Sequence, residues 1–396
     1  MESLTTGAVP RQAIEQGLYV PTPGGAVAER LVPRIDLRPA STHLVVGGIG
    51  TGKTTQLLMA VKKLEELPDV HPIFLDVSAH HDLGQLKSGV LVVVVGLALD
   101  RLLASAQSDA AKPARREFRK WAEGYTTYFE QDEEDYYDDL DDRDFGPPTF
   151  AVRTPGVVIP PEPPLDSALP DRIQALQKVL LAVQSLQNKH HILLLIDSLD
   201  RVTDLDAFSA VVMHDVRALK DAGVGVVLVG PLRVLFGTHR PITDRFDHTY
   251  HVPAVDISTP NGPAFLAEVL RLRAPSGILS DAAISELVRL SGGVLRDLIG
   301  LTQAAGEEAY IAGSDSVTRD HVATAADAFG RNLMLGLGTD EVQVLQRVRQ
   351  KGTFIQTSDK DIALLVTRRV LEYGDGHARY AVHPTIEPLL DQLATK

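Results

Sequence analysis

The stretch that decides the fold is Gly47-Gly48-Ile49-Gly50-Thr51-Gly52-Lys53-Thr54, or GGIGTGKT. It satisfies the pattern G-x-x-x-x-G-K-[ST], whose glycines let backbone N–H groups surround a phosphate. Such a loop lies between a strand and a helix. HLVV at residues 43–46 predicts the strand, and the apolar spacing from Lys53 to Leu67 predicts the helix. The sequence therefore predicts a phosphate-binding loop, called the P-loop below.

The pattern also assigns roles to individual side chains. Lys53 is expected to reach the β- and γ-phosphates of a nucleotide, and Thr54 to ligate Mg²⁺. The N-terminus of the following helix adds a partial positive charge. The residues expected to bind the cofactor are Gly47, Gly48, Ile49, Gly50, Thr51, Gly52, Lys53, Thr54 and Thr55.

A second motif is the apolar run ILLLI at residues 192–196, which is followed by Asp197. A strand of this kind presents a carboxylate beside the phosphate site of a P-loop protein, so Asp197 is expected to hold Mg²⁺ directly or through water. Asp200 is the candidate for orienting the attacking water. An alternative interpretation is that Asp200 caps the next helix.

Predicted strands and helices alternate from residue 43 to residue 230, which favours a parallel sheet covered by helices on both faces. The strands are expected at 43–46, 72–77, 192–196, 224–229 and 249–252. The helices between them are expected at 53–67, 86–106, 171–186 and 206–222. The valine run within 86–106 would also suit a strand, but the length of this stretch favours a buried helix. The predicted fold class is therefore the α/β fold of a P-loop NTPase.

The pattern changes after residue 256. Helices at 263–273, 280–290, 294–312 and 318–329 predict a helical lid. Further helices at 340–349 and 358–366, two short strands at 370–373 and 379–382 with a turn between them, and a last helix from Thr385 predict a winged helix. The predicted domains are an N-terminal segment (1–40), the P-loop core (41–255), the lid (256–330) and the winged helix (331–396).

Residues 107–170 predict a disordered surface insertion in the core, because they cannot bury enough apolar area to offset their chain entropy. The insertion contains EQDEEDYYDDLDDRD at residues 130–144, with ten acids and one base. The whole chain carries −13, so removing this local −9 leaves −13 + 9 = −4. The acidic run is either a solvated loop or a docking tail for a basic partner.

Composition excludes several classes of protein. Hydrophobic residues make up 44% and charged residues 23% of the 396 residues, which is ordinary for a globular protein. Cysteine is absent, so disulfides, thiolate zinc sites and cysteine nucleophiles are excluded. No signal peptide and no apolar run of membrane-spanning length is evident, which predicts a soluble cytoplasmic protein without a membrane partner.

Together these motifs resemble the AAA+ ATPases, in the branch that contains replication-origin initiators and STAND signalling ATPases. The resemblance covers about residues 41 to 330. DRFD at 244–247 is similar to the box that carries the arginine finger, which implies a catalytic role for Arg245 in the site of a neighbouring subunit. SGGVLR at 291–296 is similar to the lid motif that bears the sensor-2 arginine, which implies that Arg296 contacts phosphate within its own subunit. Alternatively, Arg245 pairs with Asp244 or Asp247, and Arg296 pairs with Asp297.

Two departures from the family pattern bear on the rate of turnover. The strand at 224–229 ends in Gly230-Pro231, where the family usually has a polar sensor-1 residue. Asp200 is separated from Asp197, whereas AAA+ machines usually have adjacent acids. Both features favour a slowly hydrolysing switch. The resemblance implies ATP and Mg²⁺ as cofactors, and no guanine-reading Asn/Thr-Lys-x-Asp motif is evident.

Two functions remain open from the sequence, beside a third possibility, a purely structural nucleotide-binding scaffold without turnover. The first is a STAND-like ATPase switch that forms a homo-oligomer with shared ATP sites and controls a separate effector protein, as in bacterial antiviral defence. The alternative is an ATP-dependent DNA-binding initiator or transposition-type regulator that uses the winged helix. Residues 331–396 hold nine bases and eight acids, a net +1, with Lys360, Arg368 and Arg369 as a small candidate DNA patch. Because phosphate-dominated binding needs several unopposed bases, this charge favours the first function.

Overall fold

The computed structural model describes residues 9–23, 25–105, 111–121, 169–356, 358–374 and 379–394. It divides into two compact units. The first unit comprises residues 1–31, 45–60 and 250–396, and the second comprises residues 32–44 and 61–249. The predicted division at residues 40, 255 and 330 stays a prediction.

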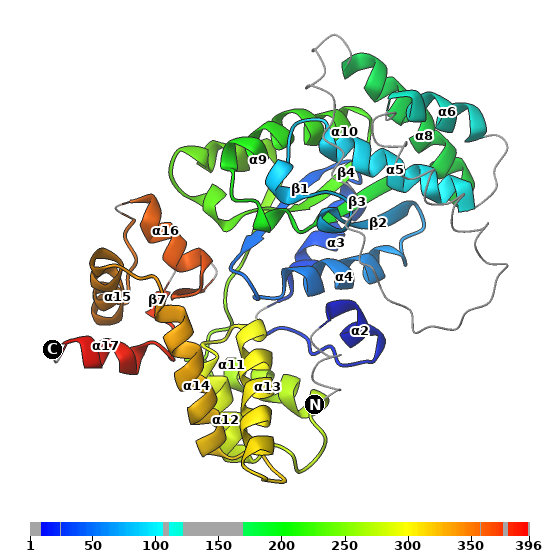
Figure 1. Cartoon of the computed structure of the whole chain (residues 1–396). Helices are drawn as coiled ribbons and strands as arrows, with labels where there is room; N and C mark the ends of the chain where they lie inside the picture. Colours follow the sequence, from blue (N-terminus) through cyan, green and yellow to red (C-terminus); the bar gives the residue numbers. More distant parts are fainter. Residues whose placement is uncertain are drawn as a thin grey trace, which may run out of the picture. The chain divides into compact units, whose positions relative to one another are not determined.

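A five-stranded sheet contains the strands expected from the sequence (Figure 1). The strands are β1 (Thr42–Gly47), β2 (Val70–Asp76), β3 (His191–Asp197), β4 (Gly225–Val229) and β5 (His248–Val252). Their order is β2-β3-β4-β1-β5, and β3 pairs in parallel with both β2 and β4. All residues of β1 and β4 are buried, including the polar Thr42 and His43 at the start of β1. The predicted α/β fold is confirmed at this level.

The strand order places a topological switch beside β1. From β1 the chain crosses β4 and β3 to reach β2, whereas from β4 it crosses β1 to reach β5. The two connections therefore leave the neighbouring strands β1 and β4 in opposite directions. Ligands of open α/β sheets bind at such a switch, outside the carboxyl ends of the strands. The P-loop follows β1 directly and so occupies this position in the sheet.

The helices of the second unit include one that the sequence did not predict. They are α5 (Val90–Ser105), α6 (Lys112–Trp121), α8 (Leu169–Gln187), α9 (Leu205–Val211), a π-helical turn (Val212–Val216) and α10 (Arg217–Asp221). Within the predicted disordered insertion, α6 is a formed helix. Its Phe118 is fully buried against Gly96, and its Arg115 and Arg119 bind the buried carboxylate of Asp100 at 2.7 and 3.0 Å. The prediction for 107–170 is therefore wrong over this helix, because partners before residue 107 cover it. The acidic run at 130–144 lies outside the described residues.

A carboxylate from a distant helix decides where α5 begins. Asp215, in the π-helical turn, accepts hydrogen bonds from the N–H groups of Gly89 and Leu91 at 2.6 and 2.8 Å. Burial raises the pKa of Asp215 to about 6 despite these bonds. The side chain supplies acceptors for the first turn of the helix, which therefore starts at Val90 rather than at the predicted residue 86.

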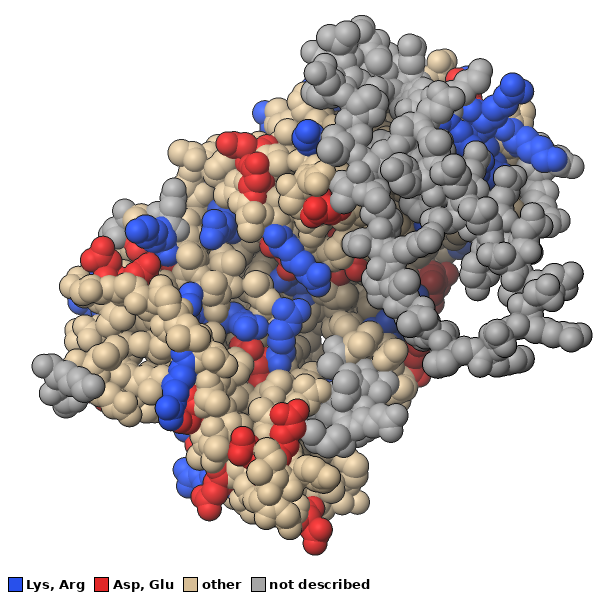
Figure 2. All heavy atoms as spheres, in the orientation of Figure 1, with Lys and Arg blue, Asp and Glu red and all other residues tan. Residues whose placement is uncertain are grey.

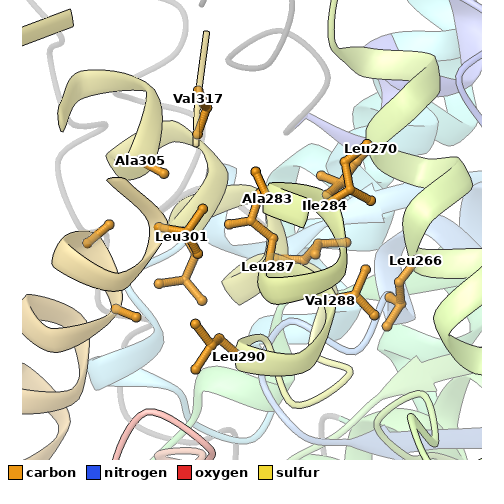
Figure 3. Close-up of a cluster of buried hydrophobic side chains, with 14 of the residues drawn as sticks. Leu266, Leu270, Ala283, Ile284, Leu287, Val288, Leu290, Leu301, Ala305 and Val317 are labelled. Carbon is orange, nitrogen blue, oxygen red and sulfur yellow. The ribbon is translucent and has the colours of Figure 1, made fainter. Parts of the chain in front are cut away.

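The helical part of the first unit is built on one apolar core. Helices α11 (Asn261–Arg273), α12 (Asp281–Leu290), α13 (Leu295–Ile311) and α14 (Arg319–Met334) enclose it, as the sequence predicted (Figure 3). Leu266, Leu270, Leu287 and Leu301 are fully buried there. The core fixes the position of α13, whose first turn carries Arg296.

The C-terminal part of the first unit has the predicted order of elements. They are α15 (Thr339–Lys351), α16 (Asp359–Val366), the antiparallel strands β6 (Val370–Tyr373) and β7 (Arg379–Val382), and α17 (Glu387–Ala394). The remaining helices of the chain are α2 (Pro10–Glu15), α3 (Val27–Leu37) and α4 (Lys53–Leu64). Across the described ranges, the helices are all too short or too polar to cross a membrane.

We expect acid to destabilise the fold through His43, on β1. The ring is fully buried, lies 2.7 Å from the Ser41 hydroxyl and stacks on the His248 ring at 5.3 Å. Burial and, to a smaller extent, the neighbouring His248 lower the pKa of His43 to about 4. Since the folded pKa lies below the unfolded value of about 6.5, the stabilisation is complete above pH 6.5 and is lost as the pH falls towards 4, by about 3 kcal/mol in all.

Urea unfolding between pH 4 and 7.5 measures this effect. His43→Leu should flatten the dependence of the unfolding free energy on pH by about one proton over this range. His190→Gln is the matched control, because the side chain of His190 is 81% exposed. Equal pH slopes in the wild type and His43→Leu would contradict the prediction.

Candidate functional site

The P-loop has a backbone that only glycine tolerates at two positions. Gly50 has φ = +82° and Gly52 has φ = +96°, which lie in the left-handed region. The Thr51 hydroxyl donates to the Gly48 carbonyl at 3.0 Å and closes the turn. At Gly47 a Cβ would overlap the Val252 carbonyl oxygen of β5. These glycines are required by the turn and by the neighbouring strand.

The Lys53 side chain is folded onto this loop. Its ammonium group donates to the carbonyl oxygens of Gly47 at 3.0 Å and Gly48 at 2.7 Å, and the residue is only 5% exposed. Helix α4 begins at Lys53, so its N-terminus opens at the loop, and no acidic residue lies in its first turn. Thr54, Thr55 and Ile49 are half-buried at the same place. The loop therefore combines two sources of positive charge, the Lys53 ammonium group and the N-terminus of α4. No acidic side chain in the first turn of α4 offsets the partial positive charge of that N-terminus.

Arg296 lies beside the P-loop. The backbone N–H of Arg296 donates to the Gly50 carbonyl at 3.2 Å, and a Cβ on Gly50 would lie 2.5 Å from the Arg296 Cβ. Arg296 is the second residue of α13 and is exposed. The structure thus brings a residue of the predicted lid to the loop from 246 positions away in the sequence (296 − 50). The predicted alternative partner, Asp297, instead lies 3.1 Å from Arg368.

In the second unit, acidic residues gather where β2 and β3 end. Asp197 is buried at 5% exposure, and its Oδ1 accepts from the Ser198 N–H at 2.8 Å. The register of the sheet pairs Asp197 with Asp76, the last residue of β2. Ser198 is buried with φ = +76°, an unusual conformation for a residue other than glycine.

Asp76 was missed by the sequence analysis. Its carboxylate accepts from the Ser78 N–H at 3.0 Å and the Ser78 hydroxyl at 2.6 Å, and it bonds the Ser198 side chain. Burial acts to raise the pKa of Asp76, but these hydrogen bonds outweigh it and lower the pKa. The available signal was the run PIFLD at 72–76, which ends in an acid like the strand before Asp197.

Asp200 lies in a 3₁₀ turn (Leu199–Arg201) just beyond β3. The helix that follows, α9, is capped by Asp204, whose Oδ1 accepts from the N–H groups of Asp206 at 2.9 Å and Ala207 at 3.0 Å. The alternative interpretation of Asp200 as that cap is therefore wrong. Its role in orienting water stays a prediction.

Arg245 is exposed at the end of a 3₁₀ segment (Gly237–Arg245). One suggested partner, Asp247, is engaged elsewhere: it accepts from the Thr42 N–H at 2.8 Å and from Lys220 at 3.1 Å. Burial acts to raise the pKa of Asp247, but the hydrogen bonds from Thr42 and Lys220 outweigh it and lower the pKa to about 2. An ion pair between Arg245 and Asp247 is thus not the arrangement found.

The missing sensor-1 residue has a packing explanation. A Cβ on Gly230 would lie 2.8 Å from Leu44 Cδ1 and 2.9 Å from Phe208 Cζ. Any larger residue at this end of β4 would have to displace β1 or α9 side chains. Position 230 therefore serves the core of the second unit.

In the part of the chain that the structure describes, no three His, Cys, Asp or Glu side chains form a group that could hold a metal ion.

Comparisons with known proteins give a distant likeness. No protein-family model and no curated protein matches the chain. Among solved structures it is similar to the Aeropyrum pernix ORC2 protein, with 13% identity over 96% of this chain and 97% of that one, at a TM-score of 0.44. It is also similar to the Aeropyrum pernix ORC1 protein in complex with DNA, with 15% identity over 92% of this chain and 91% of that one, at a TM-score of 0.42. The Thermotoga maritima RuvB Holliday junction branch migration motor is similar with 13% identity over 93% of this chain and 92% of that one, at a TM-score of 0.40. At these values the likeness assigns no activity or ligand to this chain.

Proposed function

We propose that this chain binds ATP with Mg²⁺ at the P-loop and hydrolyses it slowly, as a molecular switch of the AAA+ kind. The observation that carries the proposal is the loop itself: left-handed glycines at 50 and 52 and the Lys53 ammonium on the loop carbonyls at 2.7–3.0 Å. Together with the acid-free N-terminus of α4, these groups fit a polyphosphate chemically.

Each predicted residue then has a defined task. The N–H groups of residues 48–54 surround the β-phosphate, and Lys53 exchanges its two carbonyl partners for β- and γ-phosphate oxygens. The Thr54 hydroxyl and the Asp197 carboxylate would hold Mg²⁺, which neutralises charge on the phosphates. Asp200 orients the attacking water, and Arg296 binds phosphate from the first turn of α13.

Titration of the full chain with nucleotides in the presence of Mg²⁺ tests the proposal. We expect ATP and ADP to bind in the micromolar range and AMP to bind at least about 100-fold more weakly, because the loop is built for the β-phosphate. GTP should bind more weakly than ATP. A chain that binds no ATP at millimolar concentration would refute the nucleotide site.

We further propose that the ATP sites are shared in a homo-oligomer. The supporting observation is the exposed position of Arg245, with Asp247 already held by Thr42 and Lys220. An exposed arginine can reach the γ-phosphate of a neighbouring subunit and stabilise charge in the transition state.

Mixing two inactive variants tests the shared site. Arg245→Ala should lower ATP hydrolysis at least about tenfold, and equimolar mixing with Lys53→Ala should restore about a quarter of the wild-type rate, because one pairing in four joins an intact loop to an intact arginine. Arg240→Ala, another exposed arginine on the same segment, is the control. If mixtures that demonstrably co-assemble recover nothing, Arg245 does not act between subunits.

The output of the switch is proposed to be a separate effector protein, and antiviral defence stays a prediction from the resemblance. The alternative is DNA binding through the predicted winged helix at residues 331–396. The environment of Arg368 and Arg369, two residues of the candidate DNA patch, does not favour this alternative. Arg368 lies against Asp297, and Arg369 donates to the carbonyl oxygens of Leu333 and Leu335 at 2.5 and 2.8 Å. Figure 2 shows acidic and basic side chains interspersed on one face of the described residues.

We therefore expect weak binding of the full chain to duplex DNA. The arginines that would form the patch are already paired, so few phosphates can be neutralised. Titration with a short duplex at 50 and 200 mM salt measures the effect. Tight binding at low salt that is lost about 10³-fold at high salt would favour the DNA-binding alternative instead.

A further inference from the structure

A buried ionic cluster lies next to Arg296 in the sequence. Asp297 is 2% exposed, and two side chains from the C-terminal segment, residues 358–374 and 379–394, converge on it. Arg368 Nη1 lies 3.1 Å from Asp297 Oδ1, and His383 Nε2 lies 3.5 Å from Asp297 Oδ2. Because an unpaired carboxylate is strongly disfavoured in a protein interior, Asp297 depends on these partners for its position.

Both partners are themselves held in place. His383 Nδ1 lies 2.8 Å from the Thr385 hydroxyl and 3.4 Å from the Thr385 backbone nitrogen, and these contacts hold the ring with Nε2 near Asp297 Oδ2. Arg368 has φ = +63°, a conformation that costs energy for a residue other than glycine. The residue whose guanidinium group contacts Asp297 therefore has a strained backbone.

The first turn of α13, which carries Asp297, also contacts the P-loop. The Arg296 N–H bonds the Gly50 carbonyl at 3.2 Å, and a Cβ on Gly52 would lie 3.2 Å from Leu295 Cδ1. There is no space between the helix start and the loop. A shift of Asp297 must therefore move Arg296 and disturb its bond to Gly50.

Strand β6 reinforces the connection. The Tyr373 hydroxyl donates to the Gly292 carbonyl at 2.8 Å, and the Ala254 N–H donates to the Glu372 carbonyl at 3.1 Å. Leu371, Tyr373 and Val294 share a small apolar core. The C-terminal segment thus contacts the turn before α13 as well as Asp297 in the first turn of that helix.

We propose that Asp297 is a positioning residue through which the C-terminal segment controls nucleotide binding: held by Arg368 and His383, it fixes the first turn of α13 and so keeps Arg296 on the Gly50 carbonyl of the P-loop. This inference rests on the proposed nucleotide site. By linkage, a nucleotide that binds the loop must in turn stabilise the contacts of the C-terminal segment with Asp297.

Three variants of the full chain test the inference, with the dissociation constant of Mg²⁺-ATP as the readout. Asp297→Asn and Arg368→Gln should each weaken binding about tenfold, because each loosens the start of α13. The double variant should also lose about tenfold rather than about 100-fold, since both changes remove one interaction. Arg349→Gln with Asp391→Asn is the control, because this ion pair between α15 and α17 is exposed and its loss should leave ATP binding unchanged.

A second readout separates positioning from mere stability. Hydrogen exchange at Val370–Tyr373 should slow when ATP is added to the wild type and should not respond in Asp297→Asn. Thr385→Val, which only removes the hydroxyl beside His383, provides a mild variant that should weaken ATP binding about threefold even if Asp297→Asn fails to fold.

The outcomes distinguish the two proposals. A folded wild-type chain that binds no ATP overturns the nucleotide site and this inference together. If the wild type binds ATP, and the folded variants bind it with wild-type affinity and show the same exchange response, the nucleotide site stands and the role of Asp297 is refuted.

Discussion

Lys53→Ala is expected to abolish ATP binding, with a loss of at least about 100-fold in affinity. The ammonium group is the cationic side chain that the structure holds inside the loop, where it already makes two hydrogen bonds to carbonyl oxygens. Replacing neutral carbonyls by phosphate oxygens converts these into charge-assisted bonds, each worth about 1.5–3 kcal/mol. Calorimetric titration with Mg²⁺-ATP measures the loss, since each tenfold step is about 1.4 kcal/mol.

Lys62→Ala is the matched control for this change. Lys62 lies on the same helix, two turns beyond the loop, and is exposed. Its loss should leave the affinity within about twofold, because a solvated charge at this distance is largely screened. Thermal unfolding of both variants without nucleotide shows that the fold is intact. Wild-type affinity in a folded Lys53→Ala chain would remove the proposed phosphate contact.

Asp200→Ala is expected to slow ATP hydrolysis about 10³-fold while changing ATP affinity less than about threefold. A positioned carboxylate that orients water or accepts its proton contributes typically 10²–10⁴ to the rate. The side chain lies in the turn just after β3, whose last residue is the proposed Mg²⁺ ligand Asp197. Single-turnover hydrolysis, measured beside equilibrium binding, separates the chemical step from affinity.

The neighbouring helix cap provides the control for this prediction. Asp204→Ala removes two hydrogen bonds at the start of α9 and should lower the free energy of unfolding by about 1 kcal/mol. It should leave hydrolysis within about threefold. Equal hydrolysis rates in the wild type and Asp200→Ala would assign the orientation of water to another group, for which Asp76 is the next acid in that part of the second unit.

Local pattern predicted most of the elements. The apolar runs before Gly47 and Asp197 appear as β1 and β3, and the two short strands at 370–373 and 379–382 appear with the predicted bounds. Burial on a strand or on one face of a helix imposes a period on neighbouring residues, so it can be recognised within a short window. The basic stretch at 112–121 was not recognised as a packed helix because its many charges obscure Phe118, a buried aromatic on which the helix packs.

By itself, the sequence determined the P-loop, its glycines, and the carboxylate after the most apolar strand. These features depend on residues that are adjacent in the chain, and the turn accepts few alternatives. Only the tertiary structure decided the partners of the charges: Asp297 with Arg368, Asp247 with Lys220, and Asp204 rather than Asp200 as the helix cap. Most of these pairs join segments that lie tens of residues apart, and Asp76 meets Asp197 only through sheet register. A carboxylate has the same local signature whether it binds a metal, a helix N-terminus or an arginine, so its surroundings in the fold decide which.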